Sequence, residues 1–191
     1  MKRFVIITCA ILIPAACSTL KSYGVADYYP LKKDAAWTYR VTVYEHSAQG
    51  DSVVSTVRVV DEKDGTFTVK QGGETNSFVH TDQGFMRAKG GTYILKEPVE
   101  KDAAWEIEVS GEGMTLKGKA NVTEKGVTAT VMGKTFEQCI VVVEAYEKIF
   151  RRVATYCPRV GLVREEFFET VKGGDKLIRR AELLAHQGVG E

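Results

Sequence analysis

Alternation of apolar and polar residues with a period of two recurs along most of this chain. Residues 37–43, 105–110, 114–123 and 127–131 each place an apolar side chain at nearly every second position. Successive side chains of a β-strand point to opposite faces of the sheet, so each segment is predicted to be a strand with one dry face.

Shorter segments between glycine-rich turns extend this pattern, and no alternation of strands with helices is seen. Further strands are expected at 53–60, 66–71, 76–80, 85–89 and 92–95, between the turn signals Asp64-Gly65, Gly72-Gly73, Gly90-Gly91, Gly126 and Gly173-Gly174. Residues 176–186 fit either a helix or a strand paired back through Gly173-Gly174, and the strand is favoured. The chain is therefore predicted to be mostly β, with a curved antiparallel sheet or half-open barrel built from two related β-meanders.

The sequence Lys-Asp-Ala-Ala-Trp occurs twice, at 33–37 and at 101–105, within longer similar segments at 30–41 and 98–109. Two weaker similarities follow in the same order. Residues 60–63 resemble 122–125, and residues 84–87 resemble 161–164. Ordered similarities favour an internal duplication, with halves at about 28–96 and 97–186.

The N-terminus has the features of an export signal. A basic Met1-Lys2-Arg3 precedes an apolar run at 4–13, and Pro14-Ala15-Ala16 leads into Cys17. Such a run is too short to span a bilayer, and small residues mark a cleavage site. A cysteine at this point resembles the bacterial lipobox, in which the cysteine is lipidated. Ordinary cleavage after Ala16, with a free Cys17, is the alternative.

This interpretation divides the chain into a signal peptide at 1–16, a lipid-anchored linker at 17–27, a single β-domain at 28–186 and a tail at 187–191. By resemblance to sorting in two-membrane bacteria, Ser18 after Cys17 favours the periplasmic face of the outer membrane. The membrane would then be a partner through the N-terminal lipid.

Cys139 to Val143 is apolar at every position, so both faces of this segment should be covered. A hairpin centred on Lys148 would place residues 149–157 beside it. That register sets Cys139 opposite Cys157, Glu144 opposite Arg152, and Tyr146 opposite Phe150. Directly opposed residues lie within disulfide range, and exported proteins meet an oxidising compartment, so a structural disulfide between Cys139 and Cys157 is expected.

Several short motifs resemble a family of secreted bacterial β-proteins and lipoproteins that has no established activity. The motifs are Tyr29-Pro30-Leu31 with Trp37-Thr38-Tyr39, then Gly133-Lys134-Thr135-Phe136-Glu137-Gln138-Cys139, then Tyr156-Cys157-Pro158-Arg159-Val160-Gly161-Leu162-Val163. The resemblance spans about residues 28–185 and implies a fold and a compartment only. The family tends to have Gly where this chain has Asp34.

Signatures of common enzymes are absent from the sequence. His46, His80 and His186 do not form His-Glu-x-x-His, and Gly-x-Ser-x-Gly does not occur. His46 and His80 are expected at the surface. Glu165 and Glu166 are adjacent in a predicted strand, so they should point to opposite faces and cannot alone form a carboxylate pair. We expect no catalytic residue, no cofactor and no metal site.

The charge balance gives no case for nucleic-acid binding. Removal of Lys2 and Arg3 with the signal leaves 24 basic residues against 25 acidic ones. Arg151-Arg152 and Arg179-Arg180 are therefore expected to be solvated strand residues rather than a nucleic-acid patch.

Trp37, Tyr39 and Trp105 share the dry face of equivalent predicted strands, where they either fill a core or line a concave trough. The leading hypothesis is a lipid-anchored periplasmic domain that binds an envelope protein or an apolar ligand without catalysis. The alternatives are a structural accessory lipoprotein acting by protein–protein contact and, third, a hydrolase. A pocket would favour the first, and a closed core with a long bare edge the second.

Overall fold

The computed structural model describes residues 22–45, 48–111, 114–147 and 149–189. Cys17, the predicted signal, His46 and Lys148 lie outside these ranges. The elements are α1 (Val25–Tyr28), β1 (Ala36–Glu45), β2 (Ala48–Lys63), β3 (Thr66–Gln71), β4 (Glu74–Thr81), β5 (Gly84–Arg87), β6 (Tyr93–Lys96), β7 (Ala104–Gly111), β8 (Met114–Val131), β9 (Lys134–Tyr146), β10 (Phe150–Cys157), β11 (Gly161–Val171) and β12 (Gly174–Gln187). Across the described residues, no helix has the length and apolar character needed to cross a membrane.

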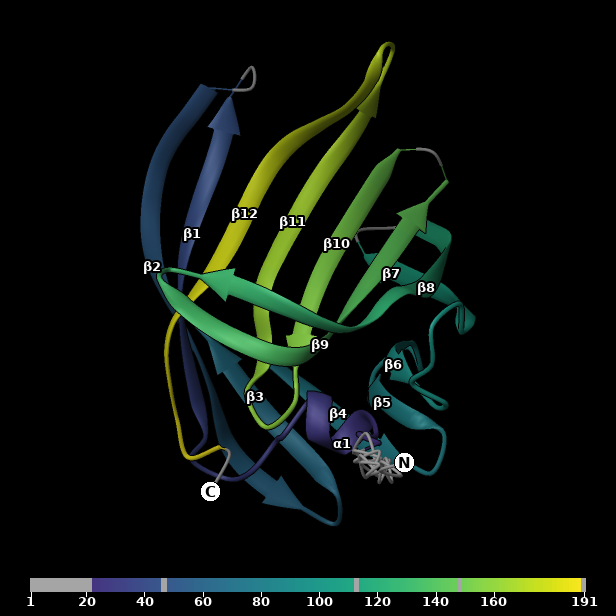
Figure 1. Ribbon diagram of the computed structural model, residues 1–191. Helices are drawn as coiled ribbons and strands as arrows, with labels where there is room; N and C mark the ends of the chain where they lie inside the picture. The colour runs from purple at the N-terminus through teal and green to yellow at the C-terminus, as the bar shows by residue number, and fades with distance from the viewer. Residues whose placement is uncertain (1–21, 46–47, 112–113, 148, 190–191) are drawn as a thin grey trace, which may run out of the picture.

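All twelve strands belong to one antiparallel sheet that curls almost into a barrel (Figure 1). Within β1–β6 and within β7–β12 each strand pairs with its neighbours in sequence, and β1 also pairs with β12. The sheet therefore consists of two six-strand meanders, β1–β6 and β7–β12, joined through β1 and β12. At the other junction β6 and β7 are the two end strands, and in the described part of the chain no backbone ladder joins them. The predicted curved antiparallel sheet of two meanders is confirmed.

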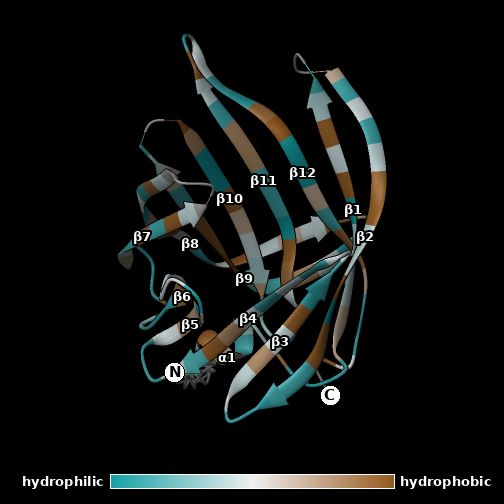
Figure 2. Cartoon of the chain, turned by 180° about the vertical axis from the view of Figure 1, so that it is seen from behind, coloured by the Kyte–Doolittle hydropathy of each residue, from teal (hydrophilic) through white to brown (hydrophobic). Residues whose placement is uncertain are grey.

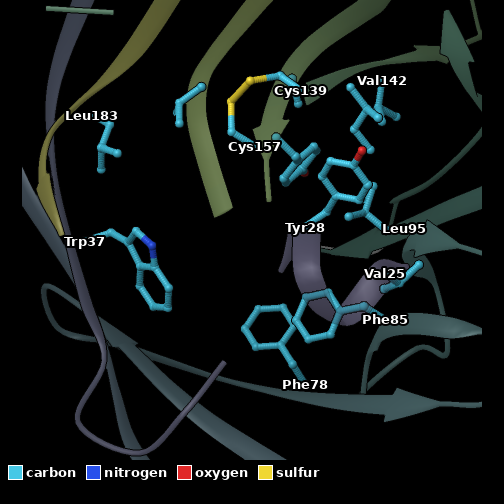
Figure 3. Packing of buried hydrophobic residues seen from close by; sticks show 14 of the residues in the cluster. Val25, Tyr28, Trp37, Phe78, Phe85, Leu95, Cys139, Val142, Cys157 and Leu183 are labelled. Atoms are coloured by element: carbon cyan, nitrogen blue, oxygen red, sulfur yellow. A yellow bond between two sulfur atoms is a disulfide. The ribbon is translucent and has the colours of Figure 1, made fainter. Parts of the chain in front are cut away.

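Hydropathy alternates along the strands as the sequence predicts (Figure 2). In β1, for example, Trp37, Tyr39 and Val41 are buried while Arg40 is exposed. Val43, which the alternation predicts on the dry face, is instead 47% exposed, where the pairing of β1 with β2 shifts register. The inward residues of both meanders meet in one core, in which the aromatic rings of Tyr28, Phe78 and Phe85 gather near α1 (Figure 3).

The two copies of Lys-Asp-Ala-Ala-Trp adopt the same local structure. The backbone N–H of Asp34 donates to the carbonyl of Val59 at 3.0 Å, and that of Asp102 donates to the carbonyl of Val122 at 2.8 Å. Both aspartates have φ of 68°. Aspartate tolerates this left-handed conformation better than most residues, so both turns form without a glycine at this position.

Both tryptophans that follow are buried, as predicted, with 4% of Trp37 and 6% of Trp105 exposed. The predicted alignment of Val60 with Val122 is wrong by one position. The hydrogen bonds make Val59 the equivalent of Val122, and a bulge follows each of these residues in its strand. This shared geometry supports the hypothesis of a duplicated six-strand unit.

The structure contradicts the turn expected at Gly126 and confirms the strand favoured at 176–186. Gly126 was expected to form a turn between two strands, but β8 runs through it without ending. Gly126 has φ of 75° and lies where the pairing of β8 with β9 shifts register, so its positive φ is accommodated by a bulge. Residues 176–186 form a strand, as favoured, which returns along β11 through Gly173-Gly174.

The predicted register of the 139–157 hairpin is confirmed. Arg152 lies opposite Glu144, and Phe150 lies opposite Tyr146. Cys139 and Cys157 form a disulfide with 4.1 Å between their Cα atoms, and both are buried. On the N-terminal side of Cys139, the hairpin of β8 and β9 leaves β10 and crosses toward β11 and β12 (Figure 1). There the Lys134 side chain donates to the carbonyl of Leu184.

The short helix α1 links the two meanders at one end of the barrel (Figure 1). The carboxylate of Glu97, in the connection between the meanders, accepts from the N–H of Val25 at 2.6 Å. The N–H of Arg159, in the β10–β11 turn, donates to the carbonyl of Asp27 at 2.7 Å. Tyr28 reaches β9, where its hydroxyl donates to the carbonyl of Gln138.

The disulfide closes a loop with a sequence separation of 18 residues, so we expect the double substitution Cys139→Ala and Cys157→Ala to lower the free energy of unfolding. Chain-entropy reasoning gives a loss of about 3 kcal/mol. Urea unfolding followed by tryptophan fluorescence measures it, with the wild type in reductant as a second comparison. Free thiols at both positions in protein purified from the periplasm would contradict the bond.

Candidate functional site

The barrel encloses a cavity of about 570 Å³. All twelve strands contribute to its wall, so the cavity is the lumen of the barrel and not a surface groove. Most of the wall is apolar, because the inward positions of the alternating strands meet there. The aliphatic and aromatic residues that line it are Tyr29, Leu31, Trp37, Tyr39, Val41, Val57, Val69, Phe78, Tyr93, Ile94, Ile107, Val109, Leu116, Tyr146, Phe150, Leu162, Phe167, Ile178 and Ala181.

Trp37 and Tyr39 belong to this wall, at positions where the sequence predicted ligand-facing aromatic residues. Their polar atoms bind the start of β11: the Trp37 indole N–H donates to the carbonyl of Val160 at 2.6 Å, and the Tyr39 hydroxyl donates to that of Leu162 at 3.0 Å. Burial raises the pKa of Tyr39 well above its ordinary value. Both side chains therefore present neutral rings to the cavity.

Gly161 makes this approach of β1 to β11 possible. Its φ is 95°, and a Cβ atom there would lie 3.3 Å from Nε1 of Trp37. Any other residue would be strained and would crowd the indole ring. The glycine of the Gly-Leu-Val motif thus has a packing role beside the cavity.

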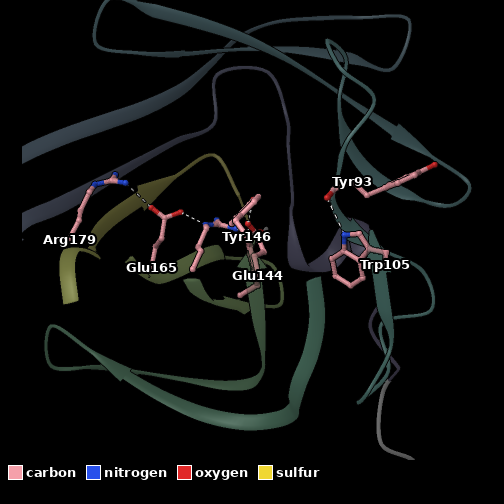
Figure 4. A network of polar contacts seen from close by, with 8 residues as sticks. Tyr93, Trp105, Glu144, Tyr146, Glu165 and Arg179 are labelled. Carbon is pink, nitrogen blue, oxygen red and sulfur yellow. Dashed lines mark hydrogen bonds and ion pairs between the residues drawn. The ribbon is translucent and has the colours of Figure 1, made fainter. Parts of the chain in front are cut away.

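Trp105 is buried but does not line the cavity, which corrects its expected ligand-facing position. Its strand, β7, is an end strand, and its indole N–H donates to the carbonyl of Tyr93 on β6 at 3.1 Å (Figure 4). The hydroxyl of Thr92 likewise donates to the carbonyl of Glu108. Side chains therefore bridge the seam between β6 and β7 in place of a backbone ladder.

A buried network of charges lies on the wall formed by β9 to β12 (Figure 4). Nε of Arg152 donates to Glu165 at 2.7 Å, and Nη1 of Arg152 donates to Glu144. Only 13% of the Arg152 side chain and 7% of the Glu144 side chain are exposed. Arg179 contacts the other oxygen of Glu165 at 3.3 Å, and the Tyr146 hydroxyl donates to Glu144 at 2.7 Å.

Strand register assembles this network from distant parts of the sequence. Glu144, Arg152, Phe167 and Arg179 form one row across four neighbouring strands. Both guanidinium groups also lie over the Phe167 ring, at 6.0 Å for Arg152 and 5.2 Å for Arg179.

The expectation that Arg152 is solvated is therefore wrong. Adjacent residues of a strand point to opposite faces, so Arg151 points outward, where it pairs with Asp175, while Arg152 points into the barrel. Glu165 and Glu166 do point to opposite faces, as predicted: Glu165 joins the network, whereas Glu166 pairs with Arg180.

The cation at the centre of the network, Arg152, keeps its charge at neutral pH. Burial alone would lower the pKa of Arg152, but the carboxylates of Glu144 and Glu165 raise it well above its ordinary value. Burial and the neighbouring Glu144 carboxylate raise the pKa of Tyr146. Arg152 is thus a permanent cation with two buried anionic partners, which suits it to positioning and binding.

His80 also differs from the expected surface position. It lies between the rings of Phe67 and Phe85, with centroid distances of 5.6 and 5.1 Å. Nε2 of His80 is buried and has no hydrogen-bond partner among the described residues. Burial lowers the pKa of His80, so its imidazole is neutral at pH 7. His186 is exposed. Within the described residues, no group of three or more His, Cys, Asp or Glu side chains is arranged to hold a metal ion.

Removal of the central cation should be costly, because it leaves two buried carboxylates unpaired. We expect Arg152→Met to lower the free energy of unfolding by about 3–5 kcal/mol. Arg180→Met removes the more exposed pair with Glu166 and should cost about 1 kcal/mol or less. Urea unfolding at pH 7 compares them, and equal losses would contradict the buried role of Arg152.

Comparison with known proteins relates the chain to its fold class. No family model and no curated protein sequence matches it. The structure is similar to the crystal structure of a candidate exported protein with YmcC-like fold from Bacteroides fragilis, with 11% identity, a TM-score of 0.50, and coverage of 83% of this chain and 98% of that one. A candidate lipoprotein from Parabacteroides distasonis matches with 13% identity, a TM-score of 0.41, and coverage of 84% and 98%. The first comparison places the chain with the YmcC-like fold.

Proposed function

We propose that this protein is a lipid-anchored binding protein of the bacterial envelope that holds an apolar ligand in its barrel and performs no catalysis. The cavity of about 570 Å³ carries the proposal. Its volume lies within the range of small-molecule sites, about 300–1,000 Å³, and its wall has the mixture of apolar residues and a few convergent polar groups that such sites use.

The energetics favour an extended apolar chain as the ligand. Transfer of each methylene group from water into an apolar site contributes about 0.8 kcal/mol, so ten such groups contribute on the order of 8 kcal/mol. This gain must exceed an association cost of several kcal/mol. A flexible chain of about this length can therefore bind, whereas a shorter one gains too little.

The envelope location rests on the N-terminal signal, on Cys17 and on the disulfide. A disulfide persists in the oxidising compartments outside the cytoplasm. The similar fold of the Bacteroides fragilis protein, which is described as exported, agrees with this location. Ser18 after Cys17 favours the periplasmic face of the outer membrane as the destination.

An accessory role through protein–protein contact is the second candidate, and the edge of β2 supports it. Among the described strands, residues 48–56 of β2 pair with β1 only, since β3 begins to pair at Val57. Val53 and Val54 on this edge are 59% and 68% exposed. An unpaired strand with exposed valines is a template for strand addition by a partner.

The binding proposal predicts that filling the cavity abolishes ligand uptake. Ala181 lines the cavity and is 4% exposed, so Ala181→Phe should lower the affinity for the uncharged probe N-phenyl-1-naphthylamine at least tenfold. Val69→Phe is a second filling variant, and Val53→Phe, at an exposed site, is the matched control. Probe fluorescence measures binding, and circular dichroism checks the fold of each variant.

Unchanged binding in folded Ala181→Phe and Val69→Phe would place the probe outside the cavity. Wild-type protein that binds no probe, and that carries no lipid when purified from membranes, would contradict the proposed function. Loss of a co-purified protein after Val54→Lys, with probe binding intact, would favour the accessory role.

The anchor has its own test. We expect Cys17→Ala to release the protein from the membrane fraction to the soluble fraction, because Cys17 is the predicted attachment site of the acyl chains. Cys9→Ala, in the predicted signal, is the matched control and should remain membrane-bound. Incorporation of labelled palmitate is measured in both, and equal labelling of wild type and Cys17→Ala would contradict Cys17 as the lipid site.

A further inference from the structure

We propose that the ligand is an amphiphile with an anionic head group, held by the guanidinium groups of Arg87 and Arg179 while its apolar chain lies in the barrel. This inference rests on the proposed function and specifies the ligand class. It accounts for the charged side chains of the cavity wall, which binding of an apolar chain alone does not explain.

The cavity wall carries an unmatched positive charge. Arg87, Arg152 and Arg179 line it together with Glu144 and Glu165, and its other lining residues are uncharged. Both carboxylates bind Arg152, and Glu165 also contacts Arg179. Three cations therefore face two anions. An anionic ligand would balance the wall, whereas a cationic one would add repulsion in a partly dehydrated site.

Arg87 is the cation that lacks a partner. It makes no ion pair with any residue in the described ranges, although it lines the cavity. Its backbone N–H donates to the carbonyl of Thr92 at 3.0 Å, which holds the end of β5 beside the seam. The side chain is thus tied to a fixed strand end while all its N–H donors are available.

Arg179 is only partly used by the network. Within the described ranges its one ion pair, with Glu165, spans 3.3 Å, and 36% of its side chain is exposed. A guanidinium group has five N–H donors arranged to bind carboxylate or phosphate oxygens in pairs. Arg179 therefore retains donors for a ligand. Arg152, in contrast, already donates to Glu144, Glu165 and Tyr156.

The free cation and the network line the same cavity. Arg87, Arg152 and Arg179 all belong to its wall, together with Tyr29 and Tyr146. In agreement with this arrangement, Arg152 and Arg87 both oppose the rise that burial causes in the pKa of Tyr29 and of Tyr146. The aromatic and aliphatic residues that make up most of the same cavity wall offer an apolar surface for the chain.

The test compares two probes that differ only in the head group: dansyl-labelled undecanoic acid and its methyl ester. We expect the wild type to bind the acid about tenfold more tightly than the ester, as for a charge-assisted hydrogen bond. Arg87→Gln should remove this preference by weakening the acid alone. Arg87 and Arg40 are both exposed, but Arg40, on β1, is not part of the cavity wall, so Arg40→Gln is the matched control and should retain the preference. Arg87→Gln breaks no ion pair among the described residues, so its fold should be unaffected.

Competition experiments identify the head group further. Displacement of the acid probe by dodecanoate but not by dodecyl phosphate indicates a carboxylate, the reverse indicates a phosphate, and dodecanol is the uncharged competitor. Equal binding of acid and ester by the wild type, or an unchanged preference in both Arg87→Gln and Arg179→Gln, would overturn the anionic head group and leave apolar binding intact. Failure of both probes to bind the wild type would overturn the proposed function as well.

Discussion

The pairing of β1 with β12 is the contact on which the rest of the structure depends. Every other ladder joins strands that are neighbours in sequence, so two separate meanders would result without it. Each would expose the dry face of six strands. Once β1 lies against β12, the dry faces turn toward one another and enclose the cavity. The same contact brings Trp37 and Tyr39 within hydrogen-bonding distance of the start of β11, where Gly161 leaves room for the indole ring.

The opposite junction is held differently. β6 has four residues and β7 has eight, and in the described part of the chain no backbone ladder joins them. Trp105 and Thr92 instead donate across the seam to backbone carbonyls. Side-chain bridges hold the edges together with fewer hydrogen bonds than a ladder would. The seam is thus the least constrained part of the cavity wall, and Arg87 lies at the strand end beside it.

Buried charge gives the cavity its chemical character. Taking Arg152 and its two carboxylates out of water is costly, and their mutual contacts offset that cost only if all three remain. Such a cluster contributes little to net stability, but it holds the rows of β9 to β12 in one register. It also leaves Arg179 and Arg87 with unused donors on an otherwise apolar wall. This combination of an apolar lumen and a cationic region is the physical basis of both proposals made above.

Much of the fold follows from local sequence, because alternation and turn residues act over a few positions. The strands of both meanders, the register of the 139–157 hairpin and its disulfide, and the shared turn before Trp37 and Trp105 were all predictable from such patterns. The bulge at Gly126 was not predictable, because a glycine with positive φ occurs in a bulge as readily as in a turn. Only the pairing with the neighbouring strand determines which of the two forms. Arg152 and His80 were misjudged for a related reason: alternation assigns a residue to a face, but the closure of the sheet decides which face is buried. Tertiary structure alone therefore placed the charges inside the barrel, since β1–β12 pairing converts one face of an open sheet into a lumen.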